Sequence, residues 1–308
     1  MSGSASPGPP AVETRDLVKR YGHTVALDRL TMSVPRGEVF GFLGPNGAGK
    51  TTAIKVLLGL TRTTSGGAWV LGRPAGDLAA RRRIGYLPEM FRYQAWLTGR
   101  EVLALHCRLS GLPRPQWDAE IRAALEAAGL ADRAGDRVAG YSKGMQQRLG
   151  LAVALLGRPD VVFLDEPTSA LDPLGRLEMR PILRALRDRG ATVFLNSHLL
   201  SEVERVCDRV AILDHGRLAF MGPLAELLEE RVVRVHVSGP DEALHAVMAR
   251  FGSLTADAGW VEIRGCDPER IPDLVAALVE AGGRVHAVEP RQTSLEERFQ
   301  ALVGGATR

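Results

Sequence analysis

Residues 44–52 read Gly44-Pro45-Asn46-Gly47-Ala48-Gly49-Lys50-Thr51-Thr52 and fit the pattern G-x-x-x-x-G-K-[ST]. An apolar run at residues 39–43 precedes this stretch and is typical of a strand that is buried on both faces. Apolar residues at positions 54, 57 and 58 follow it and share one side of a helix. A buried strand, a glycine-rich loop and a helix in this order predict a phosphate-binding loop on a parallel sheet.

The residues of this loop suit a nucleoside triphosphate bound with Mg²⁺. Glycines allow successive backbone N–H groups to point toward phosphate oxygens, and the N-terminus of the following helix adds its positive dipole end. We expect Lys50 to neutralise charge on the β- and γ-phosphates, and the hydroxyl of Thr51 to take a coordination position on Mg²⁺. Lys50 is therefore the first candidate catalytic residue.

Asp165 and Glu166 end a second apolar run, at residues 161–164. Two adjacent carboxylates at the end of a buried strand repel each other and lose hydration, so a cation or ligand is expected to balance them. In phosphate-loop enzymes an Asp at this place holds Mg²⁺. Glu166 is then placed to polarise a water molecule as a general base. We therefore predict that Asp165 is a metal ligand and that Glu166 is catalytic.

Residues 141–148 read Tyr141-Ser142-Lys143-Gly144-Met145-Gln146-Gln147-Arg148 at the start of a predicted helix. Here the chain resembles the ABC (ATP-binding cassette) ATPases, whose signature is L-S-G-G-Q-Q-x-R. Ser142 and Gly144 match this signature, whereas Tyr141, Lys143 and Met145 differ from its commonest form. The Y-S-K-G-M variant resembles drug-export cassettes with separate permeases, the ABC-2 or daunorubicin-resistance-like type. The resemblance implies that ATP is the nucleotide. It also implies a second anion site at Ser142 and Gly144, which closes on the γ-phosphate bound by a partner cassette.

Four further positions fit the same resemblance. Asp172 lies in a segment similar to the D-loop, which communicates across the dimer. His198 follows a predicted strand, where the family places a catalytic histidine that contacts the γ-phosphate. Tyr21 resembles the aromatic residue that stacks on adenine. Glu89 follows Tyr-x-Pro, where the family usually has Gln, and we expect it to bind Mg²⁺ and to belong to the loop that couples to the permease.

The resemblance covers residues 12–231 and implies an α/β fold, the P-loop NTPase ABC cassette. This fold has a parallel-sheet core, an N-terminal antiparallel β subdomain and a helical subdomain. We predict a disordered tail at residues 1–10 and an ABC ATPase domain at 11–231, with the helical subdomain at about 89–140.

Residues 232–308 predict a small C-terminal α+β accessory domain. Apolar patterning places strands at 232–237, 260–264 and 284–288, and helices at 241–251, 268–281 and 294–303. The end of this region, residues 293–299, is similar to the ending S-L-E-[ED]-x-F of drug-export cassettes.

The composition limits the classes of function. The 308 residues carry a net charge of +3, which is too small to indicate nucleic acid, and the run Arg81-Arg82-Arg83 is more typical of a solvated face. Three cysteines lie far apart, form no C-x-x-C pair and fit a reducing cytosol. No apolar run approaches the roughly 18–20 residues that span a bilayer. We therefore expect the protein to lie at the cytoplasmic face of the cell membrane, which another chain must cross.

These predictions combine into one function. An ATPase subunit would couple ATP hydrolysis, in a head-to-tail homodimer or cassette heterodimer, to export through a separate integral-membrane permease. An importer cassette remains open because importers share every catalytic motif.

Two other classes of protein are disfavoured. A non-transport ABC ATPase acting on DNA or ribosomes is disfavoured because there is one cassette and no heptad run between Lys50 and Asp165. Another P-loop enzyme, such as a GTPase or a small-molecule kinase, is disfavoured because the signature and D-loop would go unexplained, and a GTPase also because the guanine-binding motif N-K-x-D is absent. No nucleic-acid partner is expected.

Overall fold

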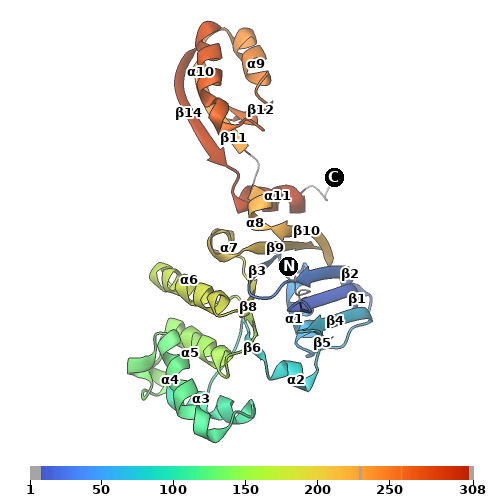
Figure 1. Cartoon of the computed structure of the whole chain (residues 1–308), viewed down its shortest axis with the longest axis vertical. Helices are drawn as coiled ribbons and strands as arrows, with labels where there is room; N and C mark the ends of the chain where they lie inside the picture. Colours follow the sequence, from blue (N-terminus) through green and yellow to red (C-terminus); the bar gives the residue numbers. More distant parts are fainter. Residues whose placement is uncertain (1–7, 229–230, 258, 305–308) are drawn as a thin grey trace, which may run out of the picture. The chain divides into compact units, whose positions relative to one another are not determined.

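A computed structural model describes residues 8–228, 231–257 and 259–304, and it divides the chain into two compact units (Figure 1). The first unit ends at Pro223 and the second begins at Leu224. Residues 1–7 of the predicted disordered tail lie outside the described residues. The short helix α8 (Leu224–Leu228) groups with the second unit, and the domain boundary at residues 231 and 232 stays a prediction.

A six-stranded sheet forms the centre of the first unit. Its order is β10 (Arg217–Pro223), β9 (Arg209–Asp214), β3 (Val39–Leu43), β8 (Thr192–Asn196), β7 (Val161–Asp165) and β6 (Ile84–Leu87). All neighbouring strands run parallel except β10, which is antiparallel to β9. Every residue of β3, β7 and β8 is buried, as expected for strands covered on both faces. The parallel core predicted from the sequence is therefore confirmed, and an antiparallel edge strand extends it.

Alternation along β3 places helices on opposite faces of this sheet. Phe40 and Phe42 point to one face, where Phe194 packs against both rings and where α1 (Lys50–Leu57) contributes to the same core. Gly41 points to the other face. A Cβ at Gly41 would lie 2.9 Å from a methyl carbon of Val203, so α7 (Leu200–Val206) packs directly on the strand.

Two smaller parts complete the first unit. The antiparallel β subdomain is a sheet ordered β2 (Thr24–Val34), β1 (Val12–Tyr21), β4 (Ser65–Val70) and β5 (Arg73–Pro74). The helices of the first unit besides α1 and α7 are α2 (Leu78–Arg81), α3 (Gly99–Leu109), α4 (Trp117–Ala127), α5 (Lys143–Leu155) and α6 (Pro173–Asp188).

The helical subdomain has a hydrophobic cluster of its own, which α3 and α4 share with α5. A capping box begins α3, because Thr98 and Glu101 each accept a hydrogen bond from the other's backbone N–H group. Short 3₁₀ turns at Arg114–Gln116, Ala131–Arg133 and Val138–Gly140 connect the longer helices.

The second unit is a four-stranded antiparallel sheet with its own hydrophobic cluster. The strand order is β12 (Ser253–Asp257), β13 (Trp260–Arg264), β11 (Arg231–Ser238) and β14 (Arg284–Gln292). Helix α9 (Asp241–Ala249) follows β11, α10 (Ile271–Glu280) follows β13, and α11 (Leu295–Gly304) ends the described chain. From β11 to β14 the order is β-α-β-β-α-β, the split βαβ arrangement. The predicted α+β class is confirmed, whereas β12 was not predicted.

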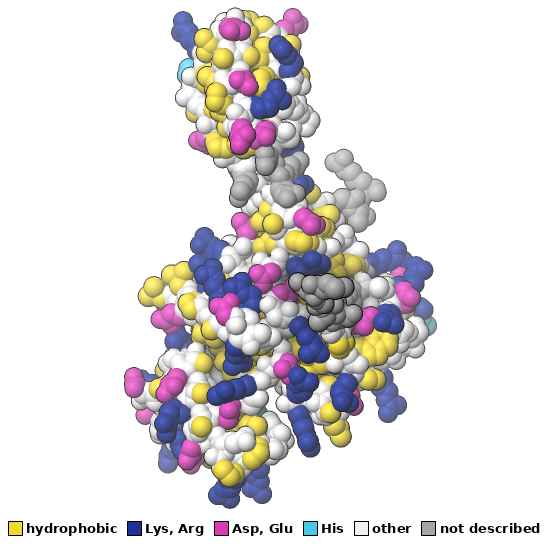
Figure 2. All heavy atoms as spheres, viewed as in Figure 1, with side chains coloured by type: hydrophobic (Ala, Val, Ile, Leu, Met, Phe, Trp, Pro, Cys, Tyr) yellow, Lys and Arg dark blue, Asp and Glu magenta, His cyan; other side chains and the backbone are white. Residues whose placement is uncertain are grey.

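Charges are distributed over the first unit. On the face seen in Figure 2, Lys and Arg side chains are spread over this unit with Asp and Glu side chains between them. Within the described ranges, no helix combines the length and the apolar character needed to cross a bilayer.

Candidate active site

The loop at residues 44–49 joins β3 directly to α1, and its backbone requires glycine. Gly49 is the N-cap of α1 and has a φ of 104°, in the left-handed region. A Cβ at this position would lie 2.3 Å from the carbonyl oxygen of Ala26. No side chain caps α1, so the N–H groups of its first turn are available to an anionic ligand.

Lys50 folds back over this loop. Its Nζ donates hydrogen bonds to the carbonyl oxygens of Gly44 at 2.6 Å and Pro45 at 3.0 Å. Burial lowers the pKa of Lys50, while Glu166 and Asp165 act in the opposite direction. The half-buried ammonium group of Lys50 and the uncapped N–H groups of α1 could all donate hydrogen bonds to the oxygens of a polyphosphate chain.

Asp165 and Asn196 meet at the carboxyl ends of β7 and β8. The two residues are paired in register, and Nδ2 of Asn196 donates to Oδ1 of Asp165 at 2.5 Å. Burial raises the pKa of Asp165, and the hydrogen bond from Asn196 opposes this effect. The amide oxygen of Asn196 is buried and has no hydrogen-bond partner among the described residues. A carboxylate and an amide oxygen are ligands that suit Mg²⁺, so the residues present fit this ion.

Glu166 follows Asp165 and is held against His198. One carboxylate oxygen of Glu166 lies 2.7 Å from Nδ1 of His198. Glu166 adopts a φ of 54°, which is uncommon for a residue with a side chain, and its backbone N–H donates to the carbonyl oxygen of Asn196. The side chain of Gln147 donates to the carbonyl oxygen of Glu166. The backbone of Glu166 is therefore fixed from two directions.

The electrostatics of Glu166 suit proton transfer. Its side chain is 11% exposed, whereas that of His198 is 61% exposed. Burial raises the pKa of Glu166, and the charge and hydrogen bond of His198 lower it. A mostly buried carboxylate with a raised pKa at the end of a strand has the character of a general base.

The signature and D-loop residues lie together, and no hydrogen bond among the described residues joins them to Lys50. Ser142 is the N-cap of α5 and accepts from the N–H of Met145, and Asp172 caps α6 in the same way through Gly175. A Cβ at Gly144 would lie 3.6 Å from the side chain of Leu171, which precedes Asp172.

Tyr21 and Glu89 both have exposed side chains. Tyr21 ends β1, is 49% exposed and has the ammonium of Lys19 at 4.6 Å from the ring centre. Glu89 lies close enough to Asp165 and Glu166 to raise the pKa of both carboxyls. It also lines an open groove together with Met90, Phe91, Arg92, Lys143, Gln146, Gln147 and Ala170.

Comparison with known proteins decides the family. The sequence profile described as "ABC transporter" matches residues 27–169. An ABC transporter ATP-binding protein of Nostoc sp. is 41% identical over 94% of this chain and 89% of its own length. The chain is an ABC transporter ATP-binding protein. The subunit is therefore an ATPase of a transporter.

Relatives with named transport roles align with nearly the whole subunit. A Nod factor export ATP-binding protein of Burkholderia thailandensis is 38% identical over 95% of this chain and 97% of its own length. The daunorubicin/doxorubicin resistance ATP-binding protein of Streptomyces peucetius is 36% identical over 96% of this chain and 92% of its own length. A solved ATP-binding subunit of an ABC transporter superposes with a TM-score of 0.65 and 32% identity, over 71% of this chain and 92% of that one. The predicted family and fold class are confirmed.

Replacing Asp165 with Asn is expected to raise the free energy of unfolding of the ligand-free ABC subunit at pH 8. Burial raises the pKa of Asp165 above its ordinary value of 3.8, so the folded state disfavours the ionised form. Asn keeps the oxygen that accepts from Asn196. The increase in unfolding free energy should be fully present above the raised pKa of Asp165. It should disappear as the pH falls through that pKa toward 3.8. Urea unfolding at a series of pH values, in EDTA, measures this difference.

The matched control is Asp118→Asn, because Asp118 is 77% exposed. This change should leave the unfolding free energy within about 0.5 kcal/mol of the wild type. An Asp165→Asn variant that is less stable than the wild type at every pH would contradict the expectation.

Proposed function

We propose that this subunit hydrolyses ATP in a head-to-tail dimer, either a homodimer or a cassette heterodimer. In each site the Lys50 loop of one cassette would face Ser142 and Gly144 of the other, with Asp172 at the interface between them. The proposal is supported by the grouping of the signature and D-loop residues with one another rather than with residues 44–52. Tyr21 would stack on adenine. The phosphates would be held by the loop residues Gly44, Pro45, Asn46, Gly47, Ala48, Gly49, Lys50, Thr51 and Thr52.

The contact between Glu166 and His198 carries the proposed mechanism. Glu166 accepts a proton from the attacking water, and His198 fixes the orientation of the carboxylate through the 2.7 Å contact. Lys50 stabilises negative charge on the phosphates during in-line attack. Catalysis therefore depends mainly on positioning and charge stabilisation.

Thr51, Asp165 and Glu89 are the proposed ligands of Mg²⁺. When bound, this ion neutralises charge on the β- and γ-phosphates. Asp165 would contribute a carboxylate whose other oxygen is fixed by Asn196. Glu89 adds a negative charge near Asp165, which supports its assignment to the same cation.

Changing Glu166 to Gln is expected to lower kcat for ATP hydrolysis by about 100- to 10,000-fold, because the general base is lost. ATP binding should persist, because Lys50 and the loop are unchanged. Size-exclusion chromatography with ATP should then show a stable dimer. Phosphate release and elution volume measure the two effects. Near-normal turnover would reject Glu166 as the base, and a monomer at high protein concentration would reject the sandwich for the isolated subunit.

Changing Glu89 to Gln is expected to weaken the activation of the ATPase by Mg²⁺, because one anionic ligand is lost. The measurement is the Mg²⁺ concentration that gives half-maximal activity at fixed ATP. The neighbouring Met90→Gln variant controls for a general disturbance of the loop. If neither the Mg²⁺ requirement nor the rate changes in Glu89→Gln, the metal role is wrong.

We further propose that the subunit works at the cytoplasmic face of the cell membrane and drives export through a separate permease. The export direction is supported by the relatives named for Nod factor export and daunorubicin resistance. The open groove beside Glu89 is the proposed contact for the permease. Met90 in this groove is 86% exposed and Trp96 on the same loop is 71% exposed, and such apolar surfaces mark interaction sites.

Purification of the tagged subunit from its own cell membranes in mild detergent should recover a membrane-spanning protein in stoichiometric amount. Mass spectrometry identifies that protein, and its loss in a Met90→Glu/Trp96→Glu variant would assign the groove as the contact. An Arg100→Glu variant, on an exposed helix position, is the control. Recovery of a substrate-binding protein with the permease would favour an importer, and recovery of soluble partners alone would favour a non-transport ATPase.

A further inference from the structure

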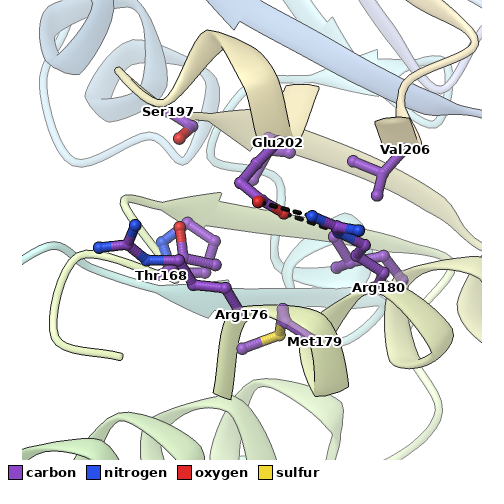
Figure 3. A pocket seen from close by; sticks show the side chains of 10 residues that line it. Thr168, Arg176, Met179, Arg180, Ser197, Glu202 and Val206 are labelled. Atoms are coloured by element: carbon purple, nitrogen blue, oxygen red, sulfur yellow. Dashed lines mark hydrogen bonds and ion pairs between the residues drawn. The ribbon is translucent and has the colours of Figure 1, made fainter. Parts of the chain in front are cut away.

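A partly buried ion pair joins the helix that follows the D-loop to the helix that follows His198. Arg180 of α6 donates from Nε to one oxygen of Glu202 at 2.9 Å and from Nη2 to the other at 2.8 Å (Figure 3). The side chains are 17% and 15% exposed. The hydrogen bonds with Arg180 lower the pKa of Glu202, so the carboxylate stays ionised.

Stability alone is a weak explanation for this pair. An exposed ion pair contributes little stability, and burying a pair costs hydration that its attraction only offsets, so a partly buried pair is a weak source of stability. The same two helices are also tied by Arg184, which donates to the carbonyl oxygen of Arg205, and by Arg187, which pairs with Asp208 just after α7. Those contacts lie at the far end of α7, whereas Glu202 lies in its first turn.

Glu202 lies in the first turn of α7, close to His198 in the sequence. His198 precedes this helix by two residues, and the only side-chain partner that the described residues give its ring is Glu166. Val203 fixes one side of α7 against Gly41 of β3. Glu202 fixes another side against α6. The contacts of the adjacent residues Glu202 and Val203 thus hold the first turn of α7 from two sides. The segment that carries His198 leads directly from β8 into this turn.

Packing beside the pair is incomplete. A void of about 10 Å³, close to the space that one water molecule needs, lies next to it. Its lining includes Thr168, two residues after Glu166, and Ser197, which precedes His198 (Figure 3). The hydroxyl of Thr168 and Nε of Arg176 are buried without a hydrogen-bond partner among the described residues. The ion pair therefore lies close, in the fold, to residues that adjoin both Glu166 and His198.

We propose that Arg180 and Glu202 are positioning residues that keep His198 within hydrogen-bond reach of Glu166. This inference rests on the proposed roles of Glu166 and His198. The same pair connects α7, which follows His198, to α6, whose N-cap is the D-loop residue Asp172. A D-loop displaced at the dimer interface would therefore displace His198 as well.

The test compares Arg180→Met and Glu202→Gln with the matched control Arg187→Met in the full-length chain. Both variants should lower kcat for ATP hydrolysis by about 10- to 100-fold, because a displaced His198 no longer orients the base. KM for ATP should stay unchanged, because neither Arg180 nor Glu202 makes a hydrogen bond or ion pair to residues 44–52 among the described residues. The control should keep both values, because Arg187 is tied to the far end of α7. If Arg180→Met does not fold, the nearly isosteric Glu202→Gln decides alone.

A double-mutant cycle with His198→Ala separates this inference from the proposed function. If Glu202 acts through His198, Glu202→Gln should cause no further loss of kcat in the His198→Ala background. An equal loss in both backgrounds, or no loss in either, overturns the positioning role. If His198→Ala alone keeps normal kcat, the proposed function of His198 fails instead.

Discussion

The register between β7 and β8 is the constraint on which the catalytic geometry depends. Parallel pairing places Asp165 beside Asn196 at the last position of both strands. The next backbone N–H, that of Glu166, then also bonds to Asn196. The segments that follow β7 and β8 leave the sheet side by side from this paired position. Glu166 and His198 therefore meet although they are far apart in sequence. A shift of register by one residue would reverse which side chains face the site.

The charges of the ionisable groups in the active site do not balance one another. Burial disfavours the ionised forms of Asp165 and Glu166 and also the charged form of Lys50. The three groups partly compensate one another, but two carboxylates and Glu89 exceed one ammonium. Lys55 also lowers the pKa of Asp165, a bound Mg²⁺ would offset the carboxylates, and nucleotide phosphates would pair with Lys50. Groups with shifted pKa values cluster at functional sites.

The sequence predicted those parts of the site that local pattern determines. The loop at residues 44–52 could be located because a buried strand, glycines and a helix succeed one another. Asp165 and Glu166 were identifiable because adjacent carboxylates at the end of an apolar run need a counter-charge. The family followed from the resemblance of residues 141–148 to the ABC signature, and the parallel core and the α+β character of the second unit followed from apolar patterning.

The remaining features depend on tertiary contacts. The bonds from Asn196 to Asp165 and from Gln147 to Glu166 require the register of β8 and the docking of α5, which no local pattern contains. Strand β12 was missed because Ser253–Asp257 is only 5 residues long and its apolar positions are limited to Leu254 and Ala256, a weak signal despite their alternation. Ser142 and Asp172 were interpreted as contacts between cassettes, and within one chain they also cap helices. The Arg180–Glu202 pair carries no sequence signal beyond two ordinary charged residues on helices.

The positive φ of Glu166 restricts how this position can drift in evolution. A lineage that abandons ATP hydrolysis loses the selection on the carboxylate but keeps the backbone, which two hydrogen bonds from elsewhere in the fold maintain. Asn, Asp and Gly tolerate this conformation, whereas valine and isoleucine do not, because their branched Cβ collides with the backbone there. Related cassettes that have lost ATPase activity should therefore carry glycine or small polar residues at this position, because the backbone conformation is kept after the catalytic carboxylate is lost.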